Sequence, residues 1–158
     1  MNATLGKVRP LLTSDLARVV QIERETFSDP WSRASFASSL REPHIRALAV
    51  VNGSAEVVGY GLATVIVDEG EILNLAVARE RRGQGFGRLI LDALLKSLWD
   101  EGVEKAYLEV RRSNEPAIAL YRAAGFQPLG VRPGYYAIPR EDALTMALEL
   151  GSQTARKR

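Results

Sequence analysis

Runs of apolar and polar positions divide the chain into alternating predicted strands and helices. Strands are predicted where Val, Ile and Leu cluster or alternate with polar residues, and helices where apolar residues recur three and four positions apart. The predicted strands are 8–12, 45–51, 57–67, 71–77, 105–110, 127–136 and 142–148. The predicted helices are 13–27, 32–40, 89–101 and 117–124. This β-α-α-β-β-β-α-β-α-β-β order predicts an α/β fold with a mixed sheet.

Turn and capping residues mark the ends of these elements. Residues 13–15 (Thr-Ser-Asp) and Ser32 precede helical patterns and are expected to cap them. The pair Asn-Gly at 52–53 predicts a hairpin turn. Pro116 at a helix start and Gly125 just past its end follow the usual asymmetry of helix termini. The last helix is therefore expected between these two residues.

The length and composition fit a single domain. A chain of 158 residues with 46% hydrophobic content can close one core and has no room for a second. The domain is expected over residues 1–150, followed by a basic and disordered tail at 151–158. The tail contains three of the 21 basic residues and none of the 19 acidic ones, so residues 1–150 carry 18 basic and 19 acidic side chains. Such a domain lacks the clustered basic charge typical of nucleic-acid binding, and no direct nucleic-acid contact is expected.

Several other classes of protein are excluded by what the chain lacks. No run approaches ~18 uninterrupted apolar residues, so no membrane span is expected, and residues 1–10 do not form a secretory signal. The chain has no cysteine and one histidine, His44. Disulfides, thiolate catalysis, zinc sites built from Cys or several His, and a Ser-His-Asp triad are therefore excluded, and no metal is expected. These features favour a cytoplasmic protein.

A glycine-rich junction follows the strand at 71–77 and leads into the helix at 89–101. It reads Arg82-Gly83-Gln84-Gly85-Phe86-Gly87-Arg88. Glycines at a strand-to-helix junction let backbone N–H groups converge on a ligand, and the positive end of the helix favours an anion. The junction therefore suits a phosphate or pyrophosphate. The alternative is a glycine turn that only connects two packed elements.

The spacing of this junction excludes two familiar phosphate-binding loops. The chain has no Gly-x-x-x-x-Gly-Lys-Ser/Thr, and Arg88 stands where a dinucleotide fold needs its third glycine. The pattern Arg82-x-x-Gly85-x-Gly87 instead resembles the acetyl-coenzyme A (acetyl-CoA) signature of the GNAT N-acetyltransferases. The resemblance implies acetyl-CoA as co-substrate, with a pyrophosphate held by the backbone of Arg82, Gly83, Gln84, Gly85, Phe86 and Gly87.

A second motif, at 108–126, resembles the late strand and helix of the same family. It reads Leu-Glu-Val-Arg-x-Ser-Asn, then Ala117, Leu120-Tyr121 and Gly125-Phe126. Together with the element order, it implies the GNAT fold over nearly the whole chain. The resemblance also implies that the strand edge at Leu75, Ala76 and Val77 binds the pantetheine arm and the thioester carbonyl. Asn114 would bind pantetheine amides, or would cap the following helix.

Two residues of this motif are candidates for proton transfer. Glu109 is the candidate general base, and Tyr121 the candidate general acid that protonates the departing thiolate. For Glu109, the alternative is a glutamate on the sheet surface that forms a salt bridge with Arg111 or Arg112. For Tyr121, the alternative is packing along one helix face. A peptide α-amine has a pKa of ~7.7–8.0 against ~10.4 for lysine, so its proton is much easier to remove.

The start of the second motif and four further segments resemble the RimI subfamily, the bacterial N-terminal acetyltransferases of ribosomal proteins. They are 29–32, 74–77, 108–114, 135–136 and 141–143. The resemblance implies that the acceptor is the N-terminus of a protein, namely the N-terminal alanine of a small-subunit ribosomal protein. The peptide groove would lie between residues 27–31 and 135–140, with Trp31 and Tyr136 flanking the first residue. Acidic residues that could attract a basic second residue are Glu23, Glu25, Asp68 and Glu69.

Two other functions remain open at this stage. A GNAT enzyme acting on a small amine or a lysine side chain would carry the same cofactor signature. A non-catalytic module that binds coenzyme A could use the same fold. The presence of Glu109, Asn114 and Tyr121 together argues against the non-catalytic module.

Overall fold

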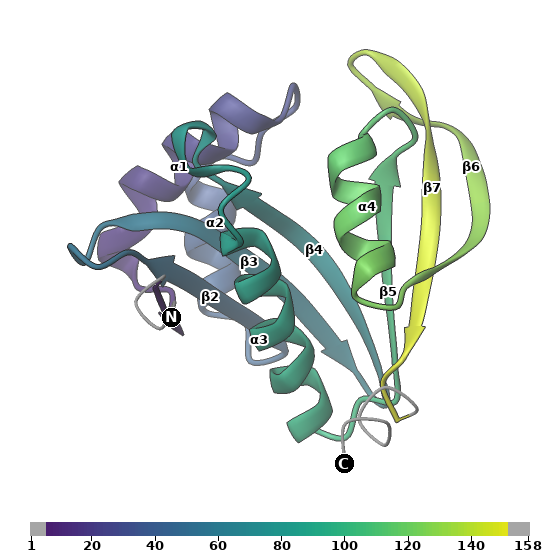
Figure 1. Ribbon diagram of the computed structural model, residues 1–158, viewed down its shortest axis with the longest axis horizontal. Helices are drawn as coiled ribbons and strands as arrows, with labels where there is room; N and C mark the ends of the chain where they lie inside the picture. The colour runs from purple at the N-terminus through teal and green to yellow at the C-terminus, as the bar shows by residue number, and fades with distance from the viewer. Residues whose placement is uncertain (1–5, 152–158) are drawn as a thin grey trace.

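The computed structural model describes residues 6–151, which form one seven-stranded sheet with helices on both faces (Figure 1). The strands are β1 (Lys7–Pro10), β2 (Ile45–Val51), β3 (Val57–Ile66), β4 (Glu69–Val77), β5 (Lys105–Arg111), β6 (Gln127–Ala137) and β7 (Arg140–Glu149). The helices are α1 (Leu16–Thr26), α2 (Arg33–Leu40), α3 (Phe86–Asp100) and α4 (Glu115–Ala123), with 3₁₀ turns η1 (Thr13–Asp15) and η2 (Arg79–Arg81). The predicted α/β element order is confirmed.

The sheet opens between its two central strands. The strand order is β1-β2-β3-β4-β5-β7-β6, and every neighbouring pair is antiparallel except the parallel pair β4–β5. β4 and β5 pair only where residues 69–72 lie beside residues 105–108. Beyond this stretch the two strands diverge, as Figure 1 shows. The second half of β4 therefore has a strand neighbour on one side alone.

A β-bulge accounts for the direction that β4 takes after its first half. The β3–β4 register shifts between Leu62 and Ala63, whose partners are Asn74 and Ile72, so that Leu73 is left without a partner. A bulge of this kind bends a strand and increases its local twist. The bend carries residues 74–77 away from β5.

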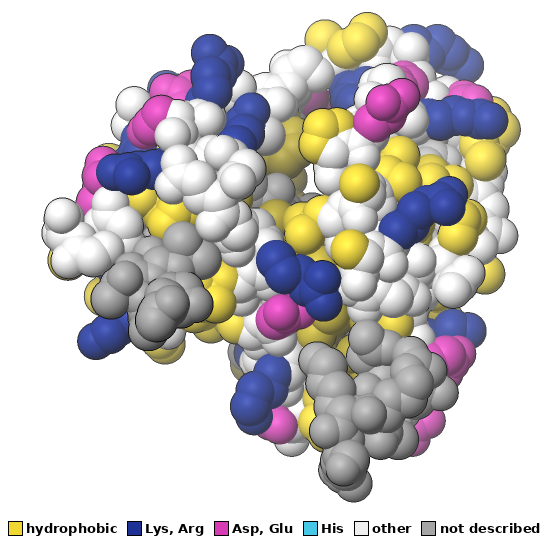
Figure 2. Space-filling view, viewed as in Figure 1, with side chains coloured by type: hydrophobic (Ala, Val, Ile, Leu, Met, Phe, Trp, Pro, Cys, Tyr) yellow, Lys and Arg dark blue, Asp and Glu magenta, His cyan; other side chains and the backbone are white. Residues whose placement is uncertain are grey.

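Two hydrophobic clusters lie on opposite faces of the sheet. On one face α3 and α4 pack on a cluster that contains Phe86, Leu91, Leu108 and Phe126. On the other face α1 and α2 pack on a smaller cluster, whose members include Phe36, Tyr60 and Leu62. Figure 2 shows a recess in the surface between the half that contains β4 and the half that contains α4, with hydrophobic side chains along its walls.

Several predicted boundaries differ from the structure, and two of these differences concern the start of β4 and the start of α3. β4 begins at Glu69 rather than at 71, because a tight turn with Val67 at φ 58° brings residues 69–70 into the ladder with β3. α3 begins at Phe86 rather than at 89, since Gly85 takes the left-handed conformation (φ 95°) and serves as its N-cap. Glycine adopts this conformation without the steric cost that other residues carry. Residues 152–158 of the predicted tail lie outside the described residues.

The two predicted helix caps have different outcomes. Ser32 caps α2 as predicted, because its Oγ accepts a hydrogen bond of 3.1 Å from the backbone N–H of Ser35. Residues 13–15 form the 3₁₀ turn η1 instead of a simple cap. The Asp15 carboxylate there accepts a hydrogen bond from the Leu12 N–H. Over residues 6–151, no helix has the length and apolar character needed to cross a membrane.

Candidate active site

The glycine-rich junction forms a set of unsatisfied backbone donors at the start of α3. Gly83 and Gly85 both have positive φ angles, of 77° and 95°. In the described part of the chain, the N–H groups of residues 83–88 have no protein acceptor. A Cβ atom added at Gly83 would meet no heavy atom within 4 Å, so the loop faces open space. Free amides beside a helix N-terminus fit the phosphate groups of a nucleotide ligand.

The Arg82 and Gln84 side chains of this junction hold the loop in place and are not directed at an anion. Arg82 folds back, and its Nε and Nη2 atoms donate to the Val77 carbonyl (3.0 Å) and to Thr26 Oγ1 (2.9 Å). Gln84 Nε2 donates to the Glu80 carbonyl at 3.4 Å. These bonds tie the loop to the end of β4 and to α1. The donors aimed at open space are therefore the backbone amides of residues 83–88. The Arg82 amide, which was expected to be among them, instead donates to the Arg79 carbonyl at 3.3 Å.

Phe86 and Gly87 fix the first turn of α3 in the fold. The Phe86 side chain is 3% exposed and belongs to the cluster beneath α3. A Cβ atom on Gly87 would lie 3.5 Å from Leu120 of α4 and 3.7 Å from Val77 of β4. The start of α3 therefore lies close to both sides of the opening in the sheet.

The edge of β4 at residues 75–77 presents backbone groups to this opening. The N–H of Ala78, just beyond β4, donates to the Val58 carbonyl at 2.8 Å, so it points toward β3. Because N–H direction alternates along a strand, the amides of Val77 and Leu75 point the other way, where β5 has already diverged. The Ala76 side chain is buried, whereas those of Leu75 and Val77 are half-buried. The predicted binding edge is thus accessible through its backbone.

Asn114 lies across the opening, at the N-terminus of α4. Its Oδ1 accepts a hydrogen bond of 3.3 Å from the Ala117 N–H, so the residue caps the helix. Its Nδ2 group has no partner among the described residues. The helix cap and a donor for a pantetheine carbonyl are therefore compatible roles for the same side chain.

Tyr121 combines a packed ring with a hydroxyl that has no hydrogen-bond partner in residues 6–151. The side chain is 7% exposed, and its ring meets that of Phe126 edge-on at 5.8 Å. Burial raises the pKa of Tyr121 to about 12, with a smaller contribution from the neighbouring Tyr136. The hydroxyl is therefore protonated at neutral pH and able to donate. The predicted role as an acid and the alternative of helix packing do not exclude each other.

Glu109 lies on the other face of the sheet, in a cavity of about 280 Å³. Its neighbours Leu108 and Val110 point into the α3–α4 cluster, so Glu109 points to the face of α1 and α2. Its carboxylate, 12% exposed, lies 2.5 Å from the Nε of Arg132. The cavity is lined by Glu69, Glu71, Tyr107, Glu109, Arg132 and Thr145, among others.

The partner of Glu109 differs from the expected alternatives, Arg111 and Arg112. In the sheet, Thr145 of β7 lies opposite both Glu109 on β5 and Gly130 on β6. Gly130 has no side chain to contact Glu109. Instead the side chain of Arg132, two residues further along β6, extends across β7 to Glu109. Arg111 and Arg112 instead pair with acidic residues at the start of β7.

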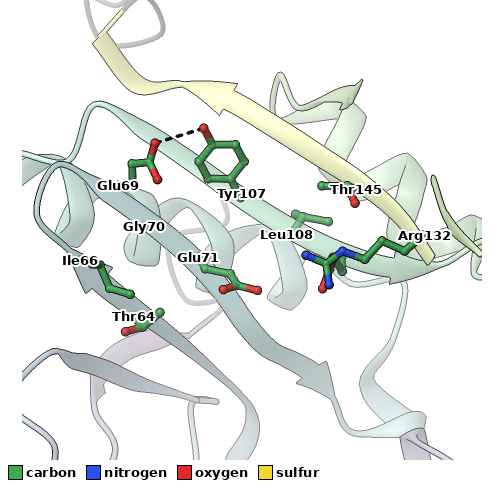
Figure 3. Close-up of a pocket in the computed structure, with 10 residues that line it drawn as sticks. Thr64, Ile66, Glu69, Gly70, Glu71, Tyr107, Leu108, Arg132 and Thr145 are labelled. Carbon is green, nitrogen blue, oxygen red and sulfur yellow. Dashed lines mark hydrogen bonds and ion pairs between the residues drawn. The ribbon is translucent and has the colours of Figure 1, made fainter. Parts of the chain in front are cut away.

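The same cavity contains two more carboxylates. Figure 3 shows the Glu71 carboxylate and the Arg132 guanidinium extending into it from β4 and β6. Burial raises the pKa of Glu71, the charge of Glu109 raises it further, and Arg132 partly offsets this. Glu69 accepts a hydrogen bond of 3.3 Å from the Tyr107 hydroxyl. The cavity thus combines negative charge with one exposed cation.

The two predicted substrate-binding residues lie in different surroundings. The ring of Tyr136 stacks under the guanidinium of Arg111, with 4.4 Å between the Arg111 Cζ and the ring centre. Burial, together with the nearby Tyr135 and Glu109, raises the pKa of Tyr136 to about 12. Trp31 instead packs against Phe36 at 5.4 Å and lines a separate open depression along α2. The structure therefore brings Tyr136, but not Trp31, beside Glu109.

A buried carboxylate holds the segment between α1 and α2. Glu23 is 1% exposed, and it accepts hydrogen bonds from the Tyr60 hydroxyl, the Asn74 amide (3.2 and 3.3 Å) and the Trp31 N–H (3.0 Å). The Oδ1 atom of Asn74 is buried without a partner. The expectation that Glu23 attracts a basic substrate residue is wrong, because its carboxylate is enclosed and already bonded.

Sequence reasoning missed Arg132 and the Glu23 network. Tyr135 and Tyr136 were selected by resemblance, but Arg132 lies only a few residues before them and carried no signal of its own. For Glu23, an acidic residue within the apolar pattern of α1 was an available hint. A charge on a helix face that is otherwise buried needs buried partners.

The arrangement has the parts needed for acyl transfer to an amine. A carboxylate can accept a proton on one face of the sheet, and a protonated tyrosine can donate one on the other. The amide edge of β4 and the loop before α3 offer hydrogen bonds to a carbonyl and to phosphates. Among the described residues, no group of three or more His, Asp and Glu side chains could hold a metal ion.

Comparison with known proteins agrees with this geometry. Residues 16–126 match the model of the acetyltransferase (GNAT) family. The chain is 36% identical over 148 residues to the ribosomal protein bS18-alanine N-acetyltransferase of Escherichia coli (strain K12), covering 92% of this chain and 99% of that protein. The corresponding protein of Salmonella typhimurium (strain LT2) is 34% identical over 148 residues, with the same coverage.

Among solved structures, the crystal structure of the ribosomal-protein-S18-alanine N-acetyltransferase from Escherichia coli superposes with a TM-score of 0.84. It shares 34% sequence identity and covers 92% of this chain and 94% of that chain. The family match spans well over half of the chain, and the relatives match almost its whole length. The predicted fold and family are confirmed: this chain belongs to the GNAT family of acetyltransferases.

Proposed function

We propose that the chain transfers the acetyl group of acetyl-CoA to the N-terminal alanine of ribosomal protein bS18. The observation that carries the proposal is the 36% identity, over nearly the full length of both chains, with an enzyme named for that reaction. The candidates Glu109 and Tyr121, on opposite faces of the sheet, add chemical support. The partner is then the N-terminus of a small-subunit ribosomal protein.

Different residues of the site bind different parts of acetyl-CoA. The free amides of residues 83–88 and the N-terminus of α3 hold the pyrophosphate, and Asn114 Nδ2 and the β4 edge bind the pantetheine arm. Bound acetyl-CoA supplies the acetyl group as a reactive thioester. An amide of Leu75 or Val77 donates to the thioester carbonyl, a contact that strengthens as negative charge develops on the oxygen.

Two proton transfers complete the reaction. Glu109, directly or through one water, takes the proton of the α-ammonium so that the amine can form the new C–N bond. As the C–S bond breaks, the Tyr121 hydroxyl gives its proton to the sulfur, and coenzyme A leaves as the thiol. The nitrogen of the new amide releases its extra proton to water, and Tyr121 recovers a proton from solvent. The raised pKa of Tyr121 keeps this proton in place at neutral pH. The peptide N-terminus, which accepts the acetyl group, must reach Glu109 from the cavity side. Acetyl-CoA must enter from the α3–α4 side.

A set of three acceptors tests the proposal. The enzyme is incubated with acetyl-CoA and a peptide that carries the first residues of bS18 and an internal lysine. The second acceptor is the same peptide blocked at its N-terminus, and the third is a polyamine. Mass spectrometry is expected to place the acetyl group on the N-terminal alanine of the first peptide. Faster modification of the internal lysine or of the polyamine would contradict the N-terminal reaction.

A further inference from the structure

Arg111, the last residue of β5, joins two segments that are far apart in the sequence. Its Nη2 donates hydrogen bonds to Ser28 Oγ (3.2 Å) and to the Ile138 carbonyl (2.7 Å). Its Nη1 donates to the Pro139 carbonyl (2.9 Å) and to Glu141 Oε1 (3.2 Å). The side chain is 20% exposed. We call these five residues the Arg111 junction.

The junction closes a contact between the two segments that were expected to flank the peptide. Ser28 belongs to the α1–α2 connection (residues 27–32), and residues 138–139 form the turn between β6 and β7. Ser28 Oγ also donates directly to the Ile138 carbonyl. In Figure 1 the α1–α2 connection and the β6–β7 turn reach toward each other at the top of the view. Among residues 6–151, no other charged side chain is hydrogen-bonded to both segments.

The junction also sets the position of groups beside Glu109. Glu109 lies two residues before Arg111 on the same face of β5, and the ring of Tyr136 lies 4.4 Å from the Arg111 Cζ. Glu141 Oε2 accepts a hydrogen bond of 2.7 Å from the Ser113 N–H, at the corner that leads to Asn114. The Arg111 guanidinium thereby orders the β6–β7 turn, the α1–α2 connection and the end of β5.

The contacts of Arg111 require an arginine, and a different cationic side chain could not make all of them. The planar guanidinium offers several N–H groups at fixed angles and can stack on an aromatic ring at the same time. Here it meets four acceptors and one ring. A lysine ammonium is a point charge with three donors on a flexible stem, so it could satisfy only part of this set.

We propose that Arg111 is a positioning residue for the acceptor amine. It holds the α1–α2 connection and the β6–β7 turn, together with Tyr136, in the arrangement that receives the peptide N-terminus beside Glu109. The inference rests on the proposed function, because the acceptor is taken to be a peptide. Acetyl-CoA binds through the other face of the sheet and meets the Arg111 junction only through the corner at Ser113, so its affinity should change little when Arg111 is replaced.

Steady-state kinetics of Arg111→Met, Arg111→Lys and Ser28→Ala test this role. Arg111→Met is expected to raise KM for the bS18 peptide by about tenfold or more and to leave KM for acetyl-CoA within about twofold. Arg111→Lys should raise the peptide KM by an intermediate amount, because it keeps the positive charge but loses the planar guanidinium with its several N–H groups. Ser28→Ala should raise the peptide KM less, and its effect should not add to that of Arg111→Met, since both remove the same contact.

Arg112→Met provides a matched control. Arg112 is the next residue, its side chain is 64% exposed, and its nearest carboxylate oxygen, on Asp142, lies 3.8 Å away. Its replacement should change neither KM. Hydrogen exchange of the backbone amides gives a readout that needs no substrate. Exchange in residues 27–32 and 134–141 should accelerate in Arg111→Met and stay unchanged in Arg112→Met.

Each outcome decides the inference. A peptide KM within about twofold of that of the unmodified enzyme, with or without faster exchange, would overturn it. A parallel rise in KM for acetyl-CoA would also overturn it, because it would indicate a general loss of structure. If the unmodified enzyme does not acetylate the peptide, the proposed function fails and the acceptor role fails with it, whereas the exchange data still report whether Arg111 orders the two segments.

Discussion

The Nε atom of Arg132 lies 2.5 Å from Oε2 of Glu109, so the proposed general base is paired with a cation. Arg132 is well exposed on the outermost strand of the sheet, whereas Glu109 is nearly buried. An exposed arginine is free to move into solvent, and an approaching ammonium can replace its positive charge beside Glu109. We infer that the acceptor amine displaces Arg132 when it reaches Glu109.

Replacing Arg132 should change the pH dependence of the reaction. Arg132 partly offsets the raised pKa of Glu71, so Arg132→Met should raise that pKa further and leave the cavity more negative. Because a protonated Glu71 no longer attracts the ammonium of the peptide, the acid limb of kcat/KM for the peptide is expected to move to higher pH. Rates measured between about pH 5 and pH 9 would show this shift. Arg122→Met, on the exposed side of α4, is the control and should leave the profile unchanged.

Glu109→Gln tests the general base. Glutamine keeps the size of the side chain but cannot accept the proton, so kcat should fall by ~10²–10⁴ while acetyl-CoA binding stays nearly intact. Glu149→Gln, which removes a carboxylate at the far end of β7, should keep normal turnover. Near-normal kcat in Glu109→Gln across the pH range would remove Glu109 from the mechanism. Glu71→Gln would then be the next variant to measure, because Glu71 lines the same cavity.

Tyr121→Phe tests the general acid. The ring packing against Phe126 remains, and the hydroxyl makes no hydrogen bond within residues 6–151, so the melting temperature should hardly change. We expect kcat to fall by at least about tenfold, because the thiolate leaves without a proton donor. With a pKa of about 12, Tyr121 should cause no loss of activity in the unmodified enzyme up to about pH 10. A Tyr121→Phe enzyme with unchanged kcat would assign the residue to packing alone.

The glycine junction can be tested through ligand-induced stabilisation. Acetyl-CoA should raise the melting temperature of the unmodified protein, because a ligand that binds only the folded state stabilises it. Gly85→Val should abolish this rise, since a β-branched residue is strained at φ 95° and would displace the amides beside it. Gly53→Val is the control, because its added atoms meet open space in a distant turn. No thermal shift for the unmodified protein at saturating acetyl-CoA would contradict the phosphate-binding role.

The Arg9–Asp15 pair predicts a pH-dependent contribution to stability. Arg9 Nη1 lies 2.7 Å from Asp15 Oδ2, and the Arg9 guanidinium holds the pKa of Asp15 below its usual 3.8. The unfolded chain therefore binds a proton at pH values where the folded chain does not. The stabilisation is complete above about pH 4 and is lost as the pH falls through the folded pKa.

Asp15→Asn should accordingly lower the free energy of unfolding by about 1–3 kcal/mol at neutral pH, since it also weakens the bond to the Leu12 N–H. Urea unfolding at neutral pH and near pH 2.5 would show the difference between variant and unmodified protein shrinking in acid. An equal difference at both pH values would mean that the carboxylate charge is not its source.

Local patterns in the sequence determined the elements and one part of the site. Ser32 caps its helix, and the glycines of the junction expose their amides as expected, because both effects act over a few neighbouring residues. Glu109, Asn114 and Tyr121 could be proposed together, because all three lie in the motif at 108–126 that carries the family resemblance. The local signal failed only at boundaries such as Gly85, where a single left-handed residue let the helix begin earlier.

Only the tertiary structure decided which side chains meet at the site. Arg132 reaches Glu109 because β7 lies between β5 and β6 and brings Thr145 opposite both strands. Arg111 meets Ser28 across 83 positions of sequence. Such contacts depend on strand order and register, and a shift of one residue would turn each side chain to the opposite face. The sequence alone determined the chemistry that the chain carries, and the sheet decided which partners each charged group has.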